Sequence, residues 1–171
     1  MEHYKPKVGD ILLVHSKGFV PMGIRLFTKC YYNHAAIIVK AMGEICVLEA
    51  IGRGFMITKT YEEYKKETCR EYAVLRPKEG KLLHSKQVND RLIDIIGKPY
   101  DYKSLLYSQI IKQVSKKDTW KGAKEMKATK RIYCSEACAY AYPYIFPKWW
   151  SIAPVDIYNE PKLEVVFKTN G

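Results

Sequence analysis

The chain has 171 residues, 47% of them hydrophobic, and a formal net charge of +11. This length and apolar content are typical of one domain with a substantial core, so we expect a single domain over residues 1–171. No window approaches the roughly 18 to 20 apolar residues that a membrane span needs. The amino-terminal residues hold no apolar stretch typical of a secretory signal peptide, and the five cysteines lack a disulfide framework spacing. These features predict a cytoplasmic protein.

The positive charge gathers in one segment, residues 112–131, where seven lysines and Arg131 face only Asp118 and Glu125. No zinc finger, aromatic strand signature or helix-turn-helix accompanies this segment, so we expect no nucleic-acid partner. Two interpretations stay open. The segment is either a solvated loop, or it borders an active cleft and attracts an anionic substrate.

The predicted elements are short strands and amphipathic helices in mixed order. Apolar runs bounded by turn residues predict strands over residues 10–15, 35–40, 45–50, 71–76 and 163–168. Helical spacing and capping residues predict helices over residues 22–29, 61–68, 85–96, 101–114 and 134–142. Because the chain shows no internal repeat and no shift of composition, these elements predict one α+β domain.

A predicted hairpin makes a geometric test of His34 and Glu49 possible. A two-residue loop at Ala41-Met42 places the two side chains directly opposite each other, with Cβ atoms about 4.5–5.5 Å apart. A loop at Met42-Gly43 leaves them diagonal on one face, and a three-residue loop separates them. The first two registers put a carboxylate beside the imidazole, where it can orient the ring and stabilise the imidazolium. The alternative is a solvent-facing Glu49 and a structural histidine at the strand end.

Cys134 begins the last predicted helix. A thiol there feels the positive end of the helix dipole, and a nearby imidazolium lowers its pKa further. The backbone N–H groups of that turn can also stabilise an oxyanion. Together with His34 and Glu49, Cys134 supplies the nucleophile, base and orienting group of thiol catalysis. A rival arrangement is a zinc site of Cys30, His34, Cys134 and Cys138, whose spacings fall within loose zinc ranges.

The other four cysteines are expected to be small apolar fillers. Cys46 lies in an apolar run and Cys138 lies one turn into a helix, so we expect both to be buried and inert. Cys30 and Cys69 are the two expected to be accessible, with ordinary pKa values of about 8.5. Cys134 should therefore be the thiol that reacts first under mildly acidic conditions.

Five segments occur in an order that is informative as a set. They are Gly9-Asp10-Ile11-Leu12-Leu13, Asn33-His34-Ala35-Ala36-Ile37-Ile38, Leu48-Glu49-Ala50, Gly97-Lys98-Pro99-Tyr100-Asp101-Tyr102 and Tyr133-Cys134-Ser135-Glu136. In this order the chain resembles the circularly permuted branch of the NlpC-type, papain-like cysteine peptidases and amidases, the YiiX-like proteins. The ending Ile152-Ala153-Pro154-Val155-Asp156-Ile157-Tyr158 also resembles that branch, so the resemblance covers nearly the whole chain.

The resemblance implies a papain-like α+β fold, in which a small antiparallel sheet packs against helices that include the helix of the catalytic cysteine. It implies that Cys134 is the nucleophile, His34 the general base and Glu49 the group that orients it. Tyr100 is implied to lie beside the nucleophile and to help hold the oxyanion. One departure is Ala137-Cys138, which stands where bulky aliphatic residues often follow the motif cysteine.

The expected function is that of a thiol hydrolase, which cleaves an amide, peptide or acyl bond through an acyl-enzyme on Cys134. Neither a cofactor nor a metal is expected. Two alternatives stay open: an acyltransferase for lipids or other acyl groups on the same fold, and a non-catalytic binding domain with a basic surface.

Overall fold

The computed structural model describes residues 4–16, 30–67, 71–78, 85–101 and 130–169. Several predictions from the sequence lie outside these residues: the helix over 22–29, the helix over 101–114 beyond its first residue, Cys69, and the basic segment 112–131 apart from Lys130 and Arg131. None of the helices within the described ranges is long and apolar enough to cross a membrane.

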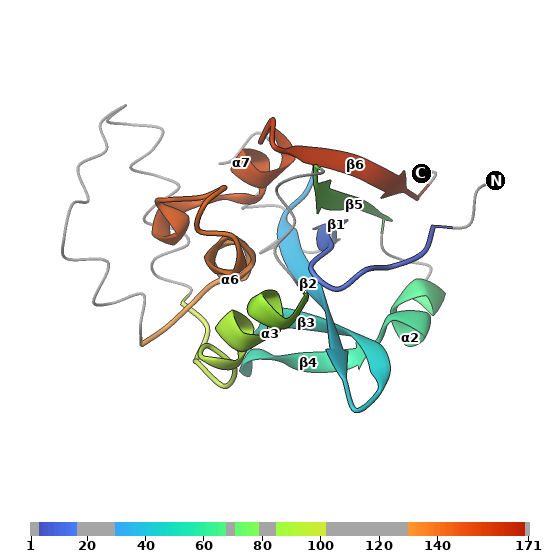
Figure 1. Ribbon diagram of the computed structural model, residues 1–171, viewed down its shortest axis with the longest axis horizontal. Helices are drawn as coiled ribbons and strands as arrows, with labels where there is room; N and C mark the ends of the chain where they lie inside the picture. Colours follow the sequence, from blue (N-terminus) through green and yellow to red (C-terminus); the bar gives the residue numbers. More distant parts are fainter. Residues whose placement is uncertain (1–3, 17–29, 68–70, 79–84, 102–129, 170–171) are drawn as a thin grey trace.

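A six-stranded antiparallel sheet forms the centre of the described structure (Figure 1). Its strand order is β4-β3-β2-β1-β5-β6. The bounds are β1 (Ile11–His15), β2 (His34–Ala41), β3 (Glu44–Ile51), β4 (Gly54–Thr60), β5 (Glu71–Pro77) and β6 (Leu163–Lys168). Five of these strands confirm the sequence predictions to within one residue at either end. β4 was not predicted, because this edge strand lacks a clean alternation of apolar and polar residues.

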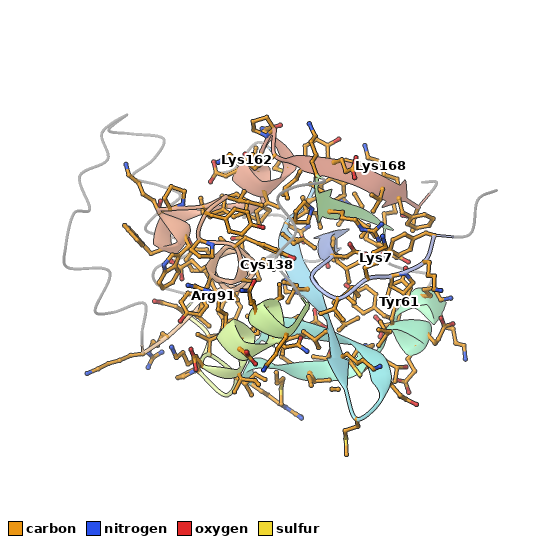
Figure 2. All side chains as sticks on the ribbon, in the orientation of Figure 1. Lys7, Tyr61, Arg91, Cys138, Lys162 and Lys168 are labelled. Carbon is orange, nitrogen blue, oxygen red and sulfur yellow. The ribbon has the colours of Figure 1, made fainter. Side chains whose placement is uncertain are left out.

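Helices cover both faces of the sheet. α3 (Ser85–Ile93) and α6 (Cys134–Ala141) lie on one side and α2 (Tyr61–Lys66) on the other, as Figure 1 shows. Alternate residues of β1 therefore enter different clusters: Ile11 packs with the α3 and α6 side, and Leu12 packs with the α2 side. Burial on both faces explains why the central strands are continuous apolar runs. Within this arrangement Cys138 points inward from α6, whereas Lys162 and Lys168 lie at the periphery (Figure 2).

Three helices end earlier in the structure than the sequence predicts. α2 ends at Lys66, α6 at Ala141 and α3 at Ile93, after which a turn leads to Gly97 with φ of +82°. Two short elements near the carboxyl end, η1 (Trp149–Ser151) and α7 (Pro154–Tyr158), were not predicted. Neither is long enough to show a helical period.

Helix α6 is anchored to the sheet through Gly9. The Tyr142 hydroxyl donates a hydrogen bond of 2.6 Å to the Gly9 carbonyl, and the Gly9 N–H donates one of 2.8 Å to the carbonyl of Ile38 on β2. Gly9 has φ of +95°, and a Cβ atom there would lie 2.1 Å from the Tyr142 hydroxyl oxygen. Only glycine allows this close approach of helix and strand.

We predict that Gly9→Ala lowers the free energy of unfolding by about 2 kcal/mol or more, because it adds a steric clash to the cost of a left-handed backbone. Gly43→Ala is the matched control, since Gly43 has φ of +87° and no atom within 4 Å of its missing Cβ. It should cost about 1–2 kcal/mol, the backbone strain alone. Urea denaturation measures both. Equal losses in the two variants would contradict the proposed packing at Gly9.

Candidate active site

The register of the β2–β3 hairpin fixes where His34 and Glu49 stand. Ala41 pairs with Glu44 and Ala36 pairs with Glu49, so the loop is Met42-Gly43. Both loop residues have positive φ, 52° and 87°, as a type I′ turn requires, and glycine favours that position. The register that leaves His34 and Glu49 diagonal on one face is therefore confirmed. The directly opposed register is wrong.

The Glu49 carboxylate is buried, with 3% of the residue exposed, and both of its oxygens are hydrogen-bonded. Oε2 lies 2.7 Å from Nε2 of His34, and Oε1 accepts a hydrogen bond of 2.7 Å from the Thr58 hydroxyl. A buried carboxylate needs such partners because it has lost its hydration. The interpretation of Glu49 as a solvent-facing residue is therefore wrong.

A bulge between β3 and β4 brings Thr58 to this carboxylate. Val47 pairs with Lys59 and Leu48 pairs with Ile57, which leaves Thr58 as the extra residue on β4. A bulge changes the direction of side chains relative to a regular ladder and is frequent beside active sites. Thr58 was missed in the sequence, because β4 itself was not predicted and no motif points to this threonine.

Cys134 is the first residue of α6 and is 1% exposed. The His34 ring and the backbone N–H of Ala35 lie close enough to its sulfur to lower the pKa of the thiol. The Tyr100 hydroxyl donates to the same sulfur over 3.9 Å. Because Nε2 of His34 faces Glu49, Nδ1 is the ring nitrogen left for the thiol. The structure thus brings together all four residues that the sequence singled out: Cys134, His34, Glu49 and Tyr100.

Tyr100 reaches the site through a short parallel pairing outside the main sheet. It forms a bridge with Ile132, which lies two residues before Cys134. The Ile132 N–H donates to the Pro99 carbonyl, and the Asp101 N–H donates to the Ile132 carbonyl, both over 3.1 Å. These bonds hold the Tyr100 backbone beside the chain that enters α6.

The first turn of α6 is also fixed from the carboxyl-terminal side. The Ser135 hydroxyl donates a hydrogen bond of 2.7 Å to the carbonyl of Ile152. The next residue, Ala153, donates its N–H to the Asp156 carboxylate over 2.7 Å and so begins α7. Residues 152–158 therefore support Ser135, the residue next to the thiol. This contact is a physical reason why the family resemblance extends to the end of the chain.

The thiol and the imidazole change each other's pKa. Burial raises the pKa of the Cys134 thiol, but the His34 charge and hydrogen bond, with smaller help from Ala35 and Tyr100, bring it below the ordinary value. Burial lowers the pKa of His34, but the Cys134 thiolate and the Glu49 carboxylate raise it above the ordinary value. The two shifts favour a thiolate–imidazolium pair, which titrates as one coupled unit.

The remaining thiols that the structure describes have the opposite character. Burial raises the pKa of Cys46 and raises that of Cys138 well above the ordinary value. Cys30 is 8% exposed, and burial raises its pKa as well, so the expectation of an accessible thiol there is wrong.

The rival zinc arrangement does not form: within the described ranges, no group of three or more His, Cys, Asp or Glu side chains could hold a metal ion.

Comparison with known proteins agrees with this geometry. The family model of the permuted papain-like amidases, the YaeF/YiiX or C92 family, matches residues 5–167. The chain belongs to this family. Its papain-like, circularly permuted α+β fold is thereby shown, and so is its relation to amidases and other hydrolases.

A solved structure shares the fold. The crystal structure of the metalloprotein YiiX from Escherichia coli O157:H7 superposes with a TM-score of 0.68. The two chains are 19% identical, and the match covers 97% of this chain and 99% of that chain. Comparison with curated proteins finds no significant match.

We predict that iodoacetamide alkylates Cys134 at a pH below the ordinary thiol pKa of about 8.5, because the thiolate persists until the pH falls through a lowered pKa. His34→Ala should move the midpoint above that value, since burial remains and the imidazolium is lost. Peptide mass spectrometry across a pH series measures each thiol separately. Cys46 and Cys138 serve as internal controls that should stay unmodified in the folded protein. An unchanged midpoint in His34→Ala would show that the pair does not exist.

We predict that Thr58→Val destabilises the protein by about 1–3 kcal/mol, because it removes the hydroxyl that donates to the buried Oε1 of Glu49. Thr58→Ser keeps the hydroxyl and should restore most of the loss. In a Glu49→Ala background, Thr58→Val should be nearly neutral. This non-additivity, measured by denaturant unfolding, is the test. Equal effects of Thr58→Val in both backgrounds would mean that the Thr58–Glu49 contact contributes nothing.

Proposed function

We propose that the protein is a cysteine hydrolase that cleaves amide, peptide or acyl bonds through a covalent intermediate on Cys134. The observation that carries this proposal is a buried thiol at a helix start, beside a histidine whose Nε2 is held 2.7 Å from a buried carboxylate. Cys134 as nucleophile, His34 as base and Glu49 as orienting group, each next to the other in space, are the parts of thiol catalysis.

The first step is attack of the Cys134 thiolate on the substrate carbonyl. The sulfur–carbon bond forms, and the carbonyl electrons move to oxygen. The backbone N–H groups in the first turn of α6 lack acceptors within the helix and face the new charge. The Tyr100 hydroxyl, which lies 3.9 Å from the sulfur in the resting protein, is a side-chain donor that can turn to the oxyanion.

The second step is departure of the amine. The His34 imidazolium gives its Nδ1 proton to the leaving nitrogen, and the carbon–nitrogen bond breaks to leave an acyl-enzyme. The neutral ring then takes a proton from water, whose oxygen attacks the thioester carbon. The sulfur–carbon bond breaks, the acyl group leaves as a carboxylic acid, and the thiolate–imidazolium pair is restored. Throughout, the Glu49 carboxylate holds Nε2–H and stabilises the imidazolium.

The substrate approaches beside His34, whose side chain is 18% exposed, while Cys134 is 1% exposed. The net charge of +11 favours an acidic or otherwise anionic substrate, since long-range attraction raises its local concentration. Whether water or another nucleophile receives the acyl group distinguishes a hydrolase from an acyltransferase on the same site.

We predict that 4-nitrophenyl acetate gives a burst of one 4-nitrophenolate per chain and leaves an acetyl group on Cys134, because the thiolate attacks activated esters as it attacks amides. Intact-mass and peptide mass spectrometry locate the adduct. Cys134→Ala should abolish the burst, and Cys46→Ala should retain it. If water releases the acetyl group from Cys134, the protein is a hydrolase. If release requires an added amine, the protein is an acyltransferase instead. A burst that survives Cys134→Ala would overturn the proposal.

We further predict different losses for two neighbours of the thiol. Glu49→Gln should lower turnover of this ester about tenfold or more, because the amide holds the wrong ring tautomer. Tyr100→Phe should leave the fold intact and lower turnover on the order of 10-fold to 1,000-fold, the range for loss of one oxyanion donor. Steady-state rates of the two variants, each checked for native circular dichroism, give the result. Full activity in either variant removes that residue from the mechanism.

A further inference from the structure

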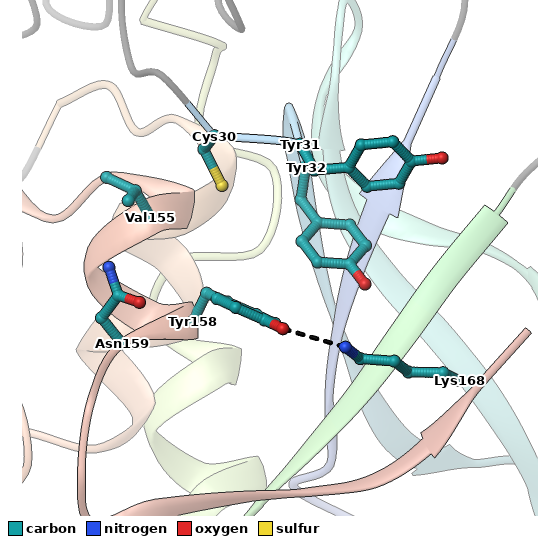
Figure 3. A pocket seen from close by; sticks show the side chains of 7 residues that line it. All are labelled: Cys30, Tyr31, Tyr32, Val155, Tyr158, Asn159 and Lys168. Atoms are coloured by element: carbon teal, nitrogen blue, oxygen red, sulfur yellow. Dashed lines mark hydrogen bonds between the residues drawn. The ribbon is translucent and has the colours of Figure 1, made fainter.

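A cavity of about 460 Å³ lies between the start of β2, α7 and the end of β6 (Figure 3). Its lining consists of residues 30–32, Val155, Tyr158, Asn159 and Lys168. None of these is among the four residues of the candidate active site. The volume falls in the range typical of sites for small molecules.

The polar end of the cavity holds an ammonium group. The Lys168 Nζ donates a hydrogen bond of 2.9 Å to the Tyr158 hydroxyl. Among the residues that the structure describes, no carboxylate pairs with Lys168, and the groups that act on its charge are phenols. The acids near the cavity are engaged elsewhere: Glu71 accepts from the Tyr31 hydroxyl, and Asp156 accepts from the Ala153 N–H. The positive charge of Lys168 is therefore available to an anion.

Two tyrosines complete the polar end and form the apolar walls. The Tyr32 and Tyr158 rings lie 5.4 Å apart at 45°, and their hydroxyls point toward the Lys168 side of the cavity in Figure 3. Because the Tyr158 oxygen accepts from Lys168, its own O–H proton remains free to donate. Burial raises the pKa of Tyr32 despite the nearby Lys168, so this phenol stays a protonated donor at neutral pH. Val155 and the ring faces supply apolar surface beside them.

We propose that this cavity binds a small molecule that carries one carboxylate and a flat apolar body. The ammonium and the two phenolic O–H groups match the lone pairs of a carboxylate, and a single cation balances a single negative charge. The ring faces and Val155 cover the apolar part. This binding site is separate from the thiol centre and does not depend on its chemistry.

Benzoate is a suitable probe, with benzamide as its neutral counterpart, and calorimetric titration of the full chain measures both. Benzoate should bind saturably and at least about tenfold more tightly than benzamide, because a charge-assisted hydrogen bond is lost with the neutral amide. Lys168→Met should weaken benzoate about tenfold or more and leave benzamide unchanged. Since Lys168 is exposed, this variant should fold normally.

Lys162→Met is the matched control. Lys162 is also exposed, and its Nζ donates to the Tyr144 carbonyl over 3.3 Å, outside the lining of the cavity. It should leave benzoate binding unchanged, and so should Cys134→Ala, which separates this site from the thiol centre. Absence of saturable benzoate binding, or equal binding in Lys168→Met and the native protein, would overturn the proposal.

Discussion

The burial of one carboxylate constrains most of the candidate site. Glu49 is 3% exposed, and its two oxygens are used by His34 and Thr58. Removing the charged partner of a buried ion pair typically costs about 3–5 kcal/mol, and removing a neutral hydrogen-bond donor costs about 1–3 kcal/mol, so the surroundings must supply both donors. The Met42-Gly43 turn sets the register that brings His34 to one oxygen, and the bulge in β4 brings Thr58 to the other.

The position of the Cys134 thiol depends on hydrogen bonds between helix α6 and residues far from it in the sequence. The Ser135 hydroxyl bonds the first turn of α6 to Ile152, and Tyr142 bonds the end of α6 to Gly9, which is itself bonded to Ile38 on β2. These bonds hold both ends of the helix in place relative to β2, which carries His34. Such preorganisation matters because misplacement of a reacting group by about 1 Å costs about 100-fold in rate.

Much of this arrangement was predictable, and the failures have physical causes. The central strands were found because burial on both faces makes them continuous apolar runs, and His34 and Glu49 were linked because side chains alternate with a period of two. The choice between two hairpin loops depends on which residues take positive φ, and the first loop considered was wrong. Thr58 was invisible, since a bulge on a weakly patterned edge strand leaves no periodic signal. Cys30 was misjudged because it belongs to the core, beside a cavity that it shares with Val155 of α7, and α7 is too short to be recognised in the sequence.

The central claim is that the resting protein holds a thiolate–imidazolium pair stabilised by Glu49. Nitrogen-15 NMR of the His34 ring tests it most directly, because the chemical shifts report whether each ring nitrogen carries a proton. At neutral pH the account predicts that both nitrogens of His34 are protonated, and that Cys134→Ala returns the ring to a neutral tautomer at the same pH. A neutral His34 ring in the native protein, or a charged ring that Cys134→Ala leaves unchanged, would contradict it.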